Sequence, residues 1–585
     1  MDVPPSLGKP EHLRSASVAL LAIGIVSLGL RFVSVAVVAA RFGAGPETDA
    51  FFLAQLLPVL LGFHSRSILH LCLVPRFVAT RDNEGQPEAW RLASSVASFA
   101  LGVLGVVAIG YALAVPFARA WVPSLAGEAG SHFVRMSRIA APVLVLFPAF
   151  AIAEAVLYSH GRYTSTAIAT LFPSLGLIAG VLLLGPRIGI EGAAWGVVGG
   201  YALQALAVLP RLLPHRRDLR IGVDWRDDSF QAVLRQIAPT TAFSLAVVTG
   251  FGIASALASH LGAGRVAAFR YGTSVLAVIP TLVQGSLVSP LYPRMAALVA
   301  AGDLARLRLL VVSFVRIASV ALAPLIVLVI VLRAPLVGAL FERGRFSAES
   351  TRLTGDVVLG FAPWIAAIVL NQVPTYLAMS MGEARRLAAL AFALLPPMTL
   401  LGYGLAERWD VGGIAFAFSV NAWISFPLLV MLLRRRLGRL GLARLVRASA
   451  RPWLAATAMG AALVPIEEHA SAWITSHAAA TALSAESASV LRLAELVALG
   501  VLGVLVDLGL ARLFGVPEIR RLLEWLRAAP VPATGPTPAA DAARAAEPGR
   551  ERRTPPVPTR DRDGERDPSP RAVEPRPLAA AGARS

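Results

Sequence analysis

The sequence predicts an all-α polytopic membrane protein, with about 14 transmembrane helices in two parallel, pseudo-symmetric lobes around a central cavity. One basis is composition: 56% of the residues are hydrophobic, 15% are charged and the mean hydropathy is +0.66, values outside the usual range of soluble domains. Apolar runs of about 20 residues also recur along the chain without the period-two alternation of a barrel. An internal duplication is the third basis.

The duplication rests on four pairs of landmarks that keep nearly one offset, about 218 residues for two pairs and about 221 for the others. Because both copies run in the same direction, we expect parallel lobes related by an axis near the membrane normal. The pairs are Gly43-Ala44-Gly45 with Gly262-Ala263-Gly264, Pro75-Arg76 with Pro293-Arg294, Gly161 with Gly382, and Glu191-Gly192-Ala193 with Gly412-Gly413-Ile414.

The apolar runs predict the spans in order, with the second interrupted at Pro58 and Gly62 and the thirteenth unusually short. Backbone groups in lipid must be satisfied internally, so each run is expected to be helical. The predicted spans are Ala16–Ala40, Asp49–Pro75, Leu92–Phe117, Phe133–Tyr158, Tyr163–Leu184, Gly192–Leu213, Ala232–Leu261, Val266–Leu291, Leu309–Leu332, Thr354–Ala378, Leu387–Leu405, Gly412–Leu433, Pro452–Pro465 and Leu491–Phe514.

These spans divide the chain into an N-lobe, 16–213, a C-lobe, 232–433, and a last helix pair, 452–514. Residues 1–15 are expected to form a cytoplasmic N-terminal segment, and 214–231 and 434–451 basic cytoplasmic loops. The extension 515–585 is rich in Pro, Ala and Arg from about residue 530, which predicts a disordered cytoplasmic tail with a possible partner-binding role.

Arginine is concentrated in alternate loops, most densely between Arg434 and Arg451. The positive-inside rule then places both termini in the cytoplasm. The net charge of +18 is therefore interpreted as topology and contact with anionic membrane lipids, and nucleic acid is not an expected partner.

Enzyme signatures are weak. The one cysteine, Cys72, lies inside a span, so neither a disulfide framework nor a paired-cysteine metal site is expected. No phosphate-binding glycine loop and no His-Glu-x-x-His motif occur. We expect no enzyme, no cofactor and no metal.

Polar side chains inside the spans are the candidate substrate-binding residues, because burying them in lipid is costly. A central arginine such as Arg31 costs about 2.5–3.5 kcal/mol on insertion scales. The alternatives are snorkelling or a structural pair for Arg31, a charge at a helix end for Asp49 and Arg270, and interhelical hydrogen bonds for the amides. The candidates are Arg31, Asp49, Gln55, Arg66, Arg270, Ser274, Gln284 and Asn371, with His64, Glu154, Gln372 and Asn421 as further polar residues in spans.

The stretch ARFGAGPETDAFFLAQLLPVLL, residues 40–61, resembles the opening motif of the MurJ/MviN lipid II flippases, which belong to the multidrug/oligosaccharidyl-lipid/polysaccharide exporter superfamily. The segment Leu340–Phe346 resembles that family's Leu-Phe-x-Arg-Gly-x-Phe element, and 357–386 resembles the segment that follows it. The resemblance covers roughly residues 15–515. It implies a bacterial inner-membrane protein.

The sequence departs from this family at its charged pairs. The family's Arg-Asp pair in the first helix is replaced by Ser34 and Val35, and Thr273-Ser274 stand where an Asp-Arg pair is usual. An Arg-Arg pair usually follows the proline of the second helix, where this chain has 62–64, Gly-Phe-His. Arg31, Arg66 and Arg270 are near enough in sequence to replace the missing cations in part.

The resemblance implies a flippase that moves an undecaprenyl-diphosphate-linked peptidoglycan precursor, lipid II, from the cytoplasmic to the periplasmic leaflet by alternating access. The expected partners are that lipid-linked saccharide, membrane lipids and cell-wall synthesis proteins. Two alternatives stay open: an exporter of another polyprenyl-linked glycan, and a non-transporting membrane scaffold for cell-wall synthesis.

Overall fold

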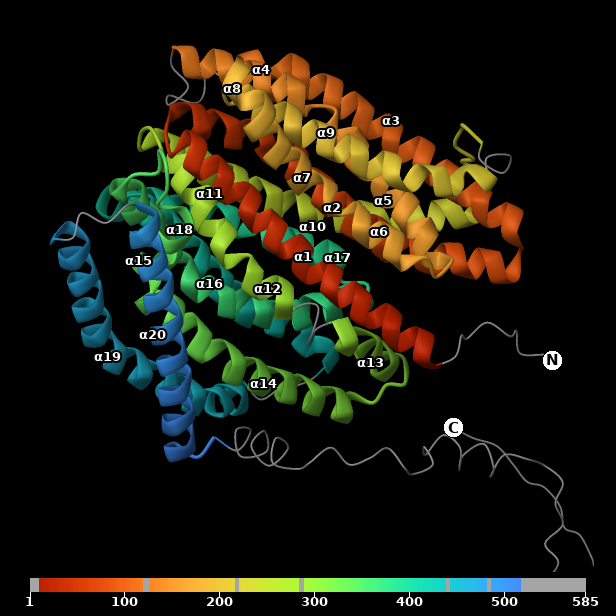
Figure 1. The fold of residues 1–585 in the computed structure, drawn as a ribbon. Helices are drawn as coiled ribbons and strands as arrows, with labels where there is room; N and C mark the ends of the chain where they lie inside the picture. The colour runs from red at the N-terminus through yellow and green to blue at the C-terminus, as the bar shows by residue number, and fades with distance from the viewer. Residues whose placement is uncertain are drawn as a thin grey trace, which may run out of the picture. The chain divides into compact units, whose positions relative to one another are not determined.

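A computed structural model describes residues 10–118, 127–215, 220–283, 289–437, 442–480 and 485–516 (Figure 1). These residues belong to one unit that spans Met1–Leu523. Every regular element among them is helical, which confirms the all-α prediction. Residues 1–9 and the expected tail from about residue 530 lie outside the described part.

The helices of the first half correspond to the predicted N-lobe, and several predicted spans are divided into shorter pieces. They are α1 (Pro10–Phe42), α2 (Pro46–Asn83), α3 (Gln86–Ala118), α4 (Glu128–Ala140), α5 (Val143–Ser159), α6 (Tyr163–Ala169), α7 (Phe172–Ala179), a π-helical turn (Gly180–Leu184), α8 (Gly185–Ile188), α9 (Glu191–Val208) and a 3₁₀ turn (Leu209–His215).

The second half is also helical and ends with two long helices. Its elements are α10 (Asp228–His260), α11 (Arg265–Leu276), α12 (Val278–Val283), α13 (Ser289–Ala300), α14 (Leu304–Val331), α15 (Arg333–Phe341), α16 (Ala348–Ser380), α17 (Ala384–Ala393), α18 (Leu395–Leu437), α19 (Leu442–Ala480) and α20 (Ala485–Leu513).

Eleven helical segments in the described residues are long and apolar enough to cross a membrane. One of them, Ala384–Arg434, is 51 residues long. Its backbone is not helical at Trp409 and Asp410, and Asp410 has a φ of 47°. The break falls between the two spans predicted for this region. The total of about 14 spans stays a prediction.

The expected interruption of the second span is wrong. α2 is continuous through Pro58 and Pro75. A proline removes only one backbone hydrogen bond, and packing against neighbouring helices allows a membrane helix to continue through it. Gly62 is a packing position, because a Cβ there would lie 2.1 Å from Cδ1 of Phe147 on α5. The eighth predicted span, by contrast, is divided, since α11 ends at Leu276 and α12 begins at Val278.

Two further boundaries differ from the prediction. Most of the expected loop 434–451 is helical, because α18 extends to Leu437 and α19 begins at Leu442. The predicted thirteenth span, Pro452–Pro465, accordingly lies inside the 39-residue helix α19. Leucine, alanine and arginine favour helix strongly, so the helices continue past the apolar residues.

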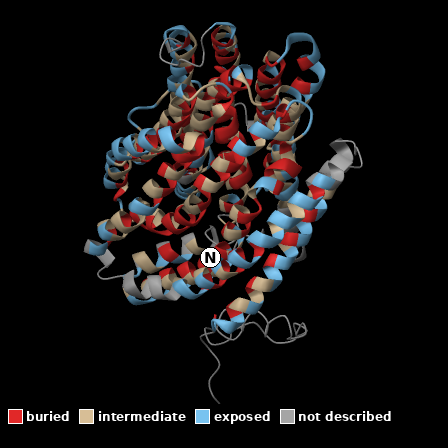
Figure 2. Ribbon diagram, turned by 90° about the vertical axis from the view of Figure 1, so that its left-hand side faces the viewer, coloured by how far each residue is buried: buried red, intermediate tan, exposed pale blue. Residues whose placement is uncertain are grey.

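Within the N-lobe, α7 and α9 pack backbone against backbone. A Cβ on Gly196 would lie 2.4 Å from the carbonyl oxygen of Gly176 and 2.7 Å from Cα of Gly180. Small residues spaced four apart allow this close approach of membrane helices, which gains dispersion energy where no hydrophobic effect operates. In general, the buried residues lie where helices meet and the exposed ones on outward faces (Figure 2).

The segment between the lobes lies against α3. The N–H groups of Arg220, Gly222 and Asp224 donate to the hydroxyls of Ser94, Ser98 and Ser95, at 3.2, 3.1 and 3.3 Å. Because α10 begins only four residues after Asp224, these bonds tie the start of the C-lobe to an N-lobe helix.

The two last helices pack against the C-lobe, where α19 contacts α14 and α20 contacts α15 (Figure 1). Arg492 on α20 forms an ion pair with Glu342, which follows α15. Between the two helices, the Ser471 hydroxyl donates to Glu495 at 2.8 Å.

Candidate functional site

The two lobes meet where the duplicated Gly-Ala-Gly turns lie, at the start of α2 and of α11. Asp49 is fully buried, and its two carboxylate oxygens accept hydrogen bonds from the backbone N–H groups of Gly264 at 2.6 Å and Ala267 at 2.7 Å. Asp49 thus caps the first turn of α11, a helix of the other lobe. A carboxylate is favoured there by the unpaired N–H groups and the helix dipole.

Further bonds join the first of these turns to α11, and α1 to the loop after α15. The Tyr271 hydroxyl donates to the carbonyl of Gly43 at 2.9 Å, and the N–H of Arg345 donates to the carbonyl of Ala40 at 2.9 Å. Gly43 has a φ of 70°, and a Cβ there would lie 2.5 Å from the Arg345 carbonyl oxygen. The closure therefore requires glycine at this position. We call this set of contacts the inter-lobe closure.

Sequence reasoning missed Tyr271 and the role of the 340–346 element. Phe341 and Phe346 pack on Tyr271, and their ring centroids lie 5.4 and 5.5 Å from the centroid of the Tyr271 ring. The repeated turns are a signal that could have indicated this contact, since equivalent loops of two parallel lobes emerge on the same membrane face.

Arg31 on α1 and Arg270 on α11 form a cationic pair near the closure. The Arg270 guanidinium lies over the Phe52 ring, 5.8 Å from its centroid, and its Nε is buried without a hydrogen-bond partner. Arg31 is exposed, and its charge acts on Arg270. Neither residue makes an ion pair within the described part of the chain. Two neighbouring like charges without a carboxylate favour binding of an anion between them.

Arg66, the third candidate cation, has a partner. Its guanidinium donates to both oxygens of Glu154 on α5, at 2.5 and 2.7 Å, and Nε2 of His70 lies 3.0 Å from the same carboxylate. Arg66 therefore differs from Arg31 and Arg270, because the charge of Arg66 is balanced by a protein carboxylate.

Ser274 and Thr273, at the positions of the family's Asp-Arg pair, bond within their own helix. The Ser274 hydroxyl donates to the carbonyl of Tyr271 at 2.7 Å, and that of Thr273 to the carbonyl of Phe269 at 2.9 Å. Neither replaces a charge.

The amide candidates have different surroundings. Asn371 donates from Nδ2 to the carbonyl of Ala422 at 2.8 Å and to Ser425 at 2.9 Å, which joins α16 to α18 as the interhelical alternative predicts. Gln55 is buried, and neither of its amide atoms has a partner among the residues that the structure describes. Gln284 lies outside the described residues.

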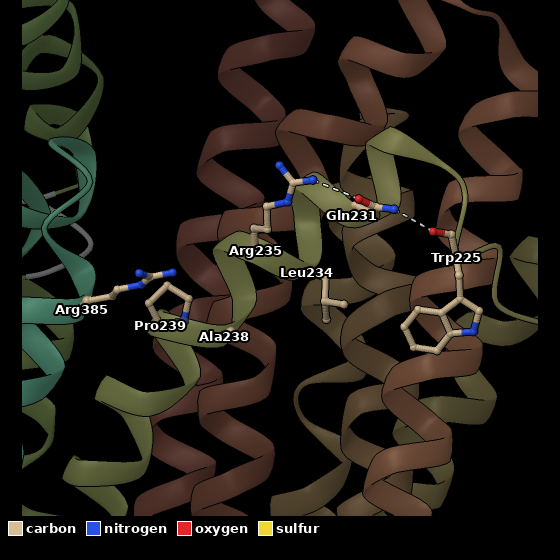
Figure 3. Close-up of a pocket in the computed structure, with 7 residues that line it drawn as sticks. All are labelled: Trp225, Gln231, Leu234, Arg235, Ala238, Pro239 and Arg385. Atoms are coloured by element: carbon tan, nitrogen blue, oxygen red, sulfur yellow. Dashed lines mark hydrogen bonds between the residues drawn. The ribbon is translucent and has the colours of Figure 1, made fainter.

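A separate pocket of about 660 Å³ runs along one face of α10 (Figure 3). Arg235 and Gln231 are joined there at 3.0 Å, and Gln231 donates to the Trp225 carbonyl at 2.8 Å. None of the predicted binding residues lines it. Its lining residues are Trp225, Gln231, Leu234, Arg235, Ala238, Pro239 and Arg385. The described residues contain no group of three or more potential metal ligands that could hold an ion.

A family profile described as "Lipid II flippase MurJ" matches residues 38–484. A lipid II flippase MurJ of Burkholderia cenocepacia is 26% identical over 412 residues, which cover 68% of this chain and 79% of that protein. A probable lipid II flippase MurJ of a Synechocystis species is 25% identical over 429 residues, or 69% and 78% of the two chains.

Solved structures share the fold. A lipid II flippase MurJ in an inward closed conformation aligns with a TM-score of 0.64 at 14% identity, over 86% of this chain and all of that one. An inward-facing multidrug resistance MATE family transporter of the MOP superfamily aligns with a TM-score of 0.57 at 16% identity, over 72% and 98%. Together with the apolar helices, these matches identify a multi-pass bacterial membrane protein.

Proposed function

This chain belongs to the lipid II flippase MurJ family, and from that premise we propose that it moves lipid II, an undecaprenyl-diphosphate-linked peptidoglycan precursor, from the cytoplasmic to the periplasmic leaflet by alternating access. The relatives that match most of its length carry this function in their names.

The observation that carries the proposal is the pair of arginines on facing helices of the two lobes. Arg31 and Arg270 have no carboxylate partner in the described chain, although Nε of Arg270 is buried. A diphosphate supplies two negative groups, and the planar guanidinium donates parallel charge-assisted hydrogen bonds to each. Binding of the diphosphate would relieve the repulsion between the cations, while the polyprenyl tail remains in lipid.

Breaking and re-forming of the inter-lobe closure would change which side of the membrane has access to the cationic pair. Asp49 and Tyr271 hold the two lobes together on the side of the Gly-Ala-Gly turns. If those turns face the periplasm, as the arginine distribution predicts, the cationic pair is closed to that side until these bonds break. Release of the head group then requires the lobes to separate at Gly43 and Gly264. The same orientation puts both termini in the cytoplasm, and membership of the MurJ family supports a place in the inner membrane.

The test is rescue of a bacterial strain depleted of its own lipid II flippase. The wild-type chain should restore growth and normal cell shape, and Arg270→Ala should fail at equal membrane levels. Failure of the wild-type chain, with normal insertion, would favour an exporter of another polyprenyl-linked glycan. Rescue by a double Arg31→Ala/Arg270→Ala variant would favour a scaffold role in recruiting cell-wall synthesis proteins.

A further inference from the structure

The inference concerns the charged cluster in the N-lobe that the cationic pair does not include. Glu154 has a fully buried side chain, while the side chains of Arg66 and His70 are 32% and 25% exposed. The carboxylate is thus inaccessible, whereas its two basic partners are partly exposed. Burial of Glu154 depends on its two basic partners, because an unpaired carboxylate would be strongly unfavourable there.

The geometry fixes which nitrogen of His70 can accept a proton. Nε2 lies 3.0 Å from the Glu154 carboxylate, and an ionised carboxylate only accepts hydrogen bonds. Neutral His70 therefore carries its proton on Nε2, which leaves the Nδ1 lone pair free. The His70 ring also stands edge-on to Tyr158, with centroids 5.0 Å apart at 86°, and this contact holds its orientation.

The charged surroundings of the cluster are simple. Among the described residues, Arg66 and His70 are the groups that act on Glu154, and Glu154, Arg66 and Tyr163 act on Tyr158. No other charged residue of the helices packed against α2 and α5 is among the groups that act on Glu154 or Tyr158. Imidazole is the side chain that ordinarily changes charge between pH 5 and 8. His70 supplies the imidazole of this cluster.

We propose that Nδ1 of His70 is a proton-binding site, and that proton binding there is coupled to binding of the anionic head group at the neighbouring Arg66. This inference rests on the proposed function. In the step, a hydronium ion gives its proton to the Nδ1 lone pair, so that one O–H bond breaks, one N–H bond forms and a water molecule is left. Glu154 holds the resulting imidazolium. The net charge of the cluster rises from zero to one positive charge.

The coupling follows from that charge change. With His70 neutral, Glu154 balances Arg66 and the cluster has little attraction for an anion. With His70 protonated, the same carboxylate is shared by two cations, so Arg66 has charge left for a phosphate oxygen. By linkage, an anion bound at the cluster strengthens proton binding by the same factor. A transporter with this site takes up a proton with its substrate.

The experiment uses the full chain in nanodiscs with undecaprenyl diphosphate as the probe. The affinity of the wild-type chain should rise at least about fivefold between pH 8 and pH 6. His70→Gln can still donate a hydrogen bond to Glu154 but does not titrate, so its affinity should be nearly independent of pH. Probe binding near pH 7 in weak buffer should take up protons with the wild-type chain, and not with His70→Gln.

The matched control is His64→Gln, because His64 lies on the same helix and no hydrogen bond joins it to Glu154 in the structure. It should keep the wild-type pH dependence. A pH dependence that survives in His70→Gln, or one that is absent from the wild-type chain while the probe binds, overturns the inference alone. Absence of probe binding at every pH, with folded protein, contradicts the proposed function instead.

Discussion

Asp49 accepts a hydrogen bond of 2.6 Å from the backbone N–H of Gly264, which lies 215 residues later in the chain. Both residues belong to the turns that the duplication repeats, and the bond crosses from one lobe to the other. The carboxylate is fully buried, so water does not compete for it while the closure is intact. This contact ties opening of the inter-lobe closure to the loss of a helix cap.

Asp49→Asn should loosen the closure. Asparagine has one acceptor oxygen in place of two and no charge, so α11 loses about 0.5–2 kcal/mol of capping. In a Cys72→Ala background, a cysteine placed at Ser274 should then react faster with an impermeant thiol reagent added from the periplasmic side. Glu47→Gln removes an exposed carboxylate from the first turn of α2, which also holds Asp49, and should leave the labelling rate unchanged. An unaltered rate in Asp49→Asn would show that the cap does not hold the closure.

Arg31→Ala and Arg270→Ala should each weaken transport about 10- to 100-fold, because each removes a charge-assisted hydrogen bond to phosphate worth about 1.5–3 kcal/mol. Arg270→Lys should retain part of the rate, since lysine keeps the charge without the planar fork. Flipping of lipid II in reconstituted vesicles measures the effect. Arg41→Ala, an exposed charge on the same helix as Arg31, is the control. Normal rates in both alanine variants would contradict the role of the pair.

Arg66→Ala should destabilise the fold more than either of those substitutions, by about 3–5 kcal/mol, because it leaves Glu154 buried without its bidentate partner. Thermal unfolding in detergent measures the difference. The double variant Arg66→Ala/Glu154→Ala should regain part of the loss, as expected for two residues in direct contact. Equal stability of the single variant and the wild-type chain is the opposing result.

Gly196→Ala should destabilise the N-lobe by about 1–3 kcal/mol through overpacking. The new Cβ would meet a backbone atom of α7 at 2.4 Å and one of the π-helical turn that follows α7 at 2.7 Å, and backbone cannot move aside as a side chain can. Gly199→Ala is the matched control, because a Cβ at Gly199 meets no atom within 4 Å. The comparison requires only unfolding temperatures of the two variants. Equal temperatures would show that the α7–α9 contact can relax.

The predicted topology can be tested with single cysteines in a Cys72→Ala background. Cysteines at Ile221 and Arg434 should be labelled only from the cytoplasmic side, and one at Glu128 only from the periplasmic side, since loops rich in arginine stay inside. All three positions are exposed. Labelling of Arg434→Cys from outside intact cells would reverse the orientation.

Much of the fold follows from local patterns. Apolar runs predicted the helices near the observed bounds, and the break at Trp409 and Asp410 falls between two predicted spans. The errors arise where packing decides. Pro58 and Gly62 predict an interruption, yet α2 continues because Phe147 of a neighbouring helix occupies the space beside Gly62. The charge of residues 434–451 predicts a loop, but most of them are helical because leucine, alanine and arginine favour helix.

The candidate site shows the same division. Composition, apolar runs and duplication by themselves determined a membrane protein built from repeated helices, because burial in lipid acts on each segment separately. Only the tertiary structure decided which charges are paired. Arg66 is paired with Glu154, 88 residues away, and Asp49 caps α11 of the other lobe, whereas Arg31 and Arg270 have no carboxylate partner in the described part of the chain. Ion pairs and caps depend on distances between segments remote in sequence, and those distances are set by how the helices pack.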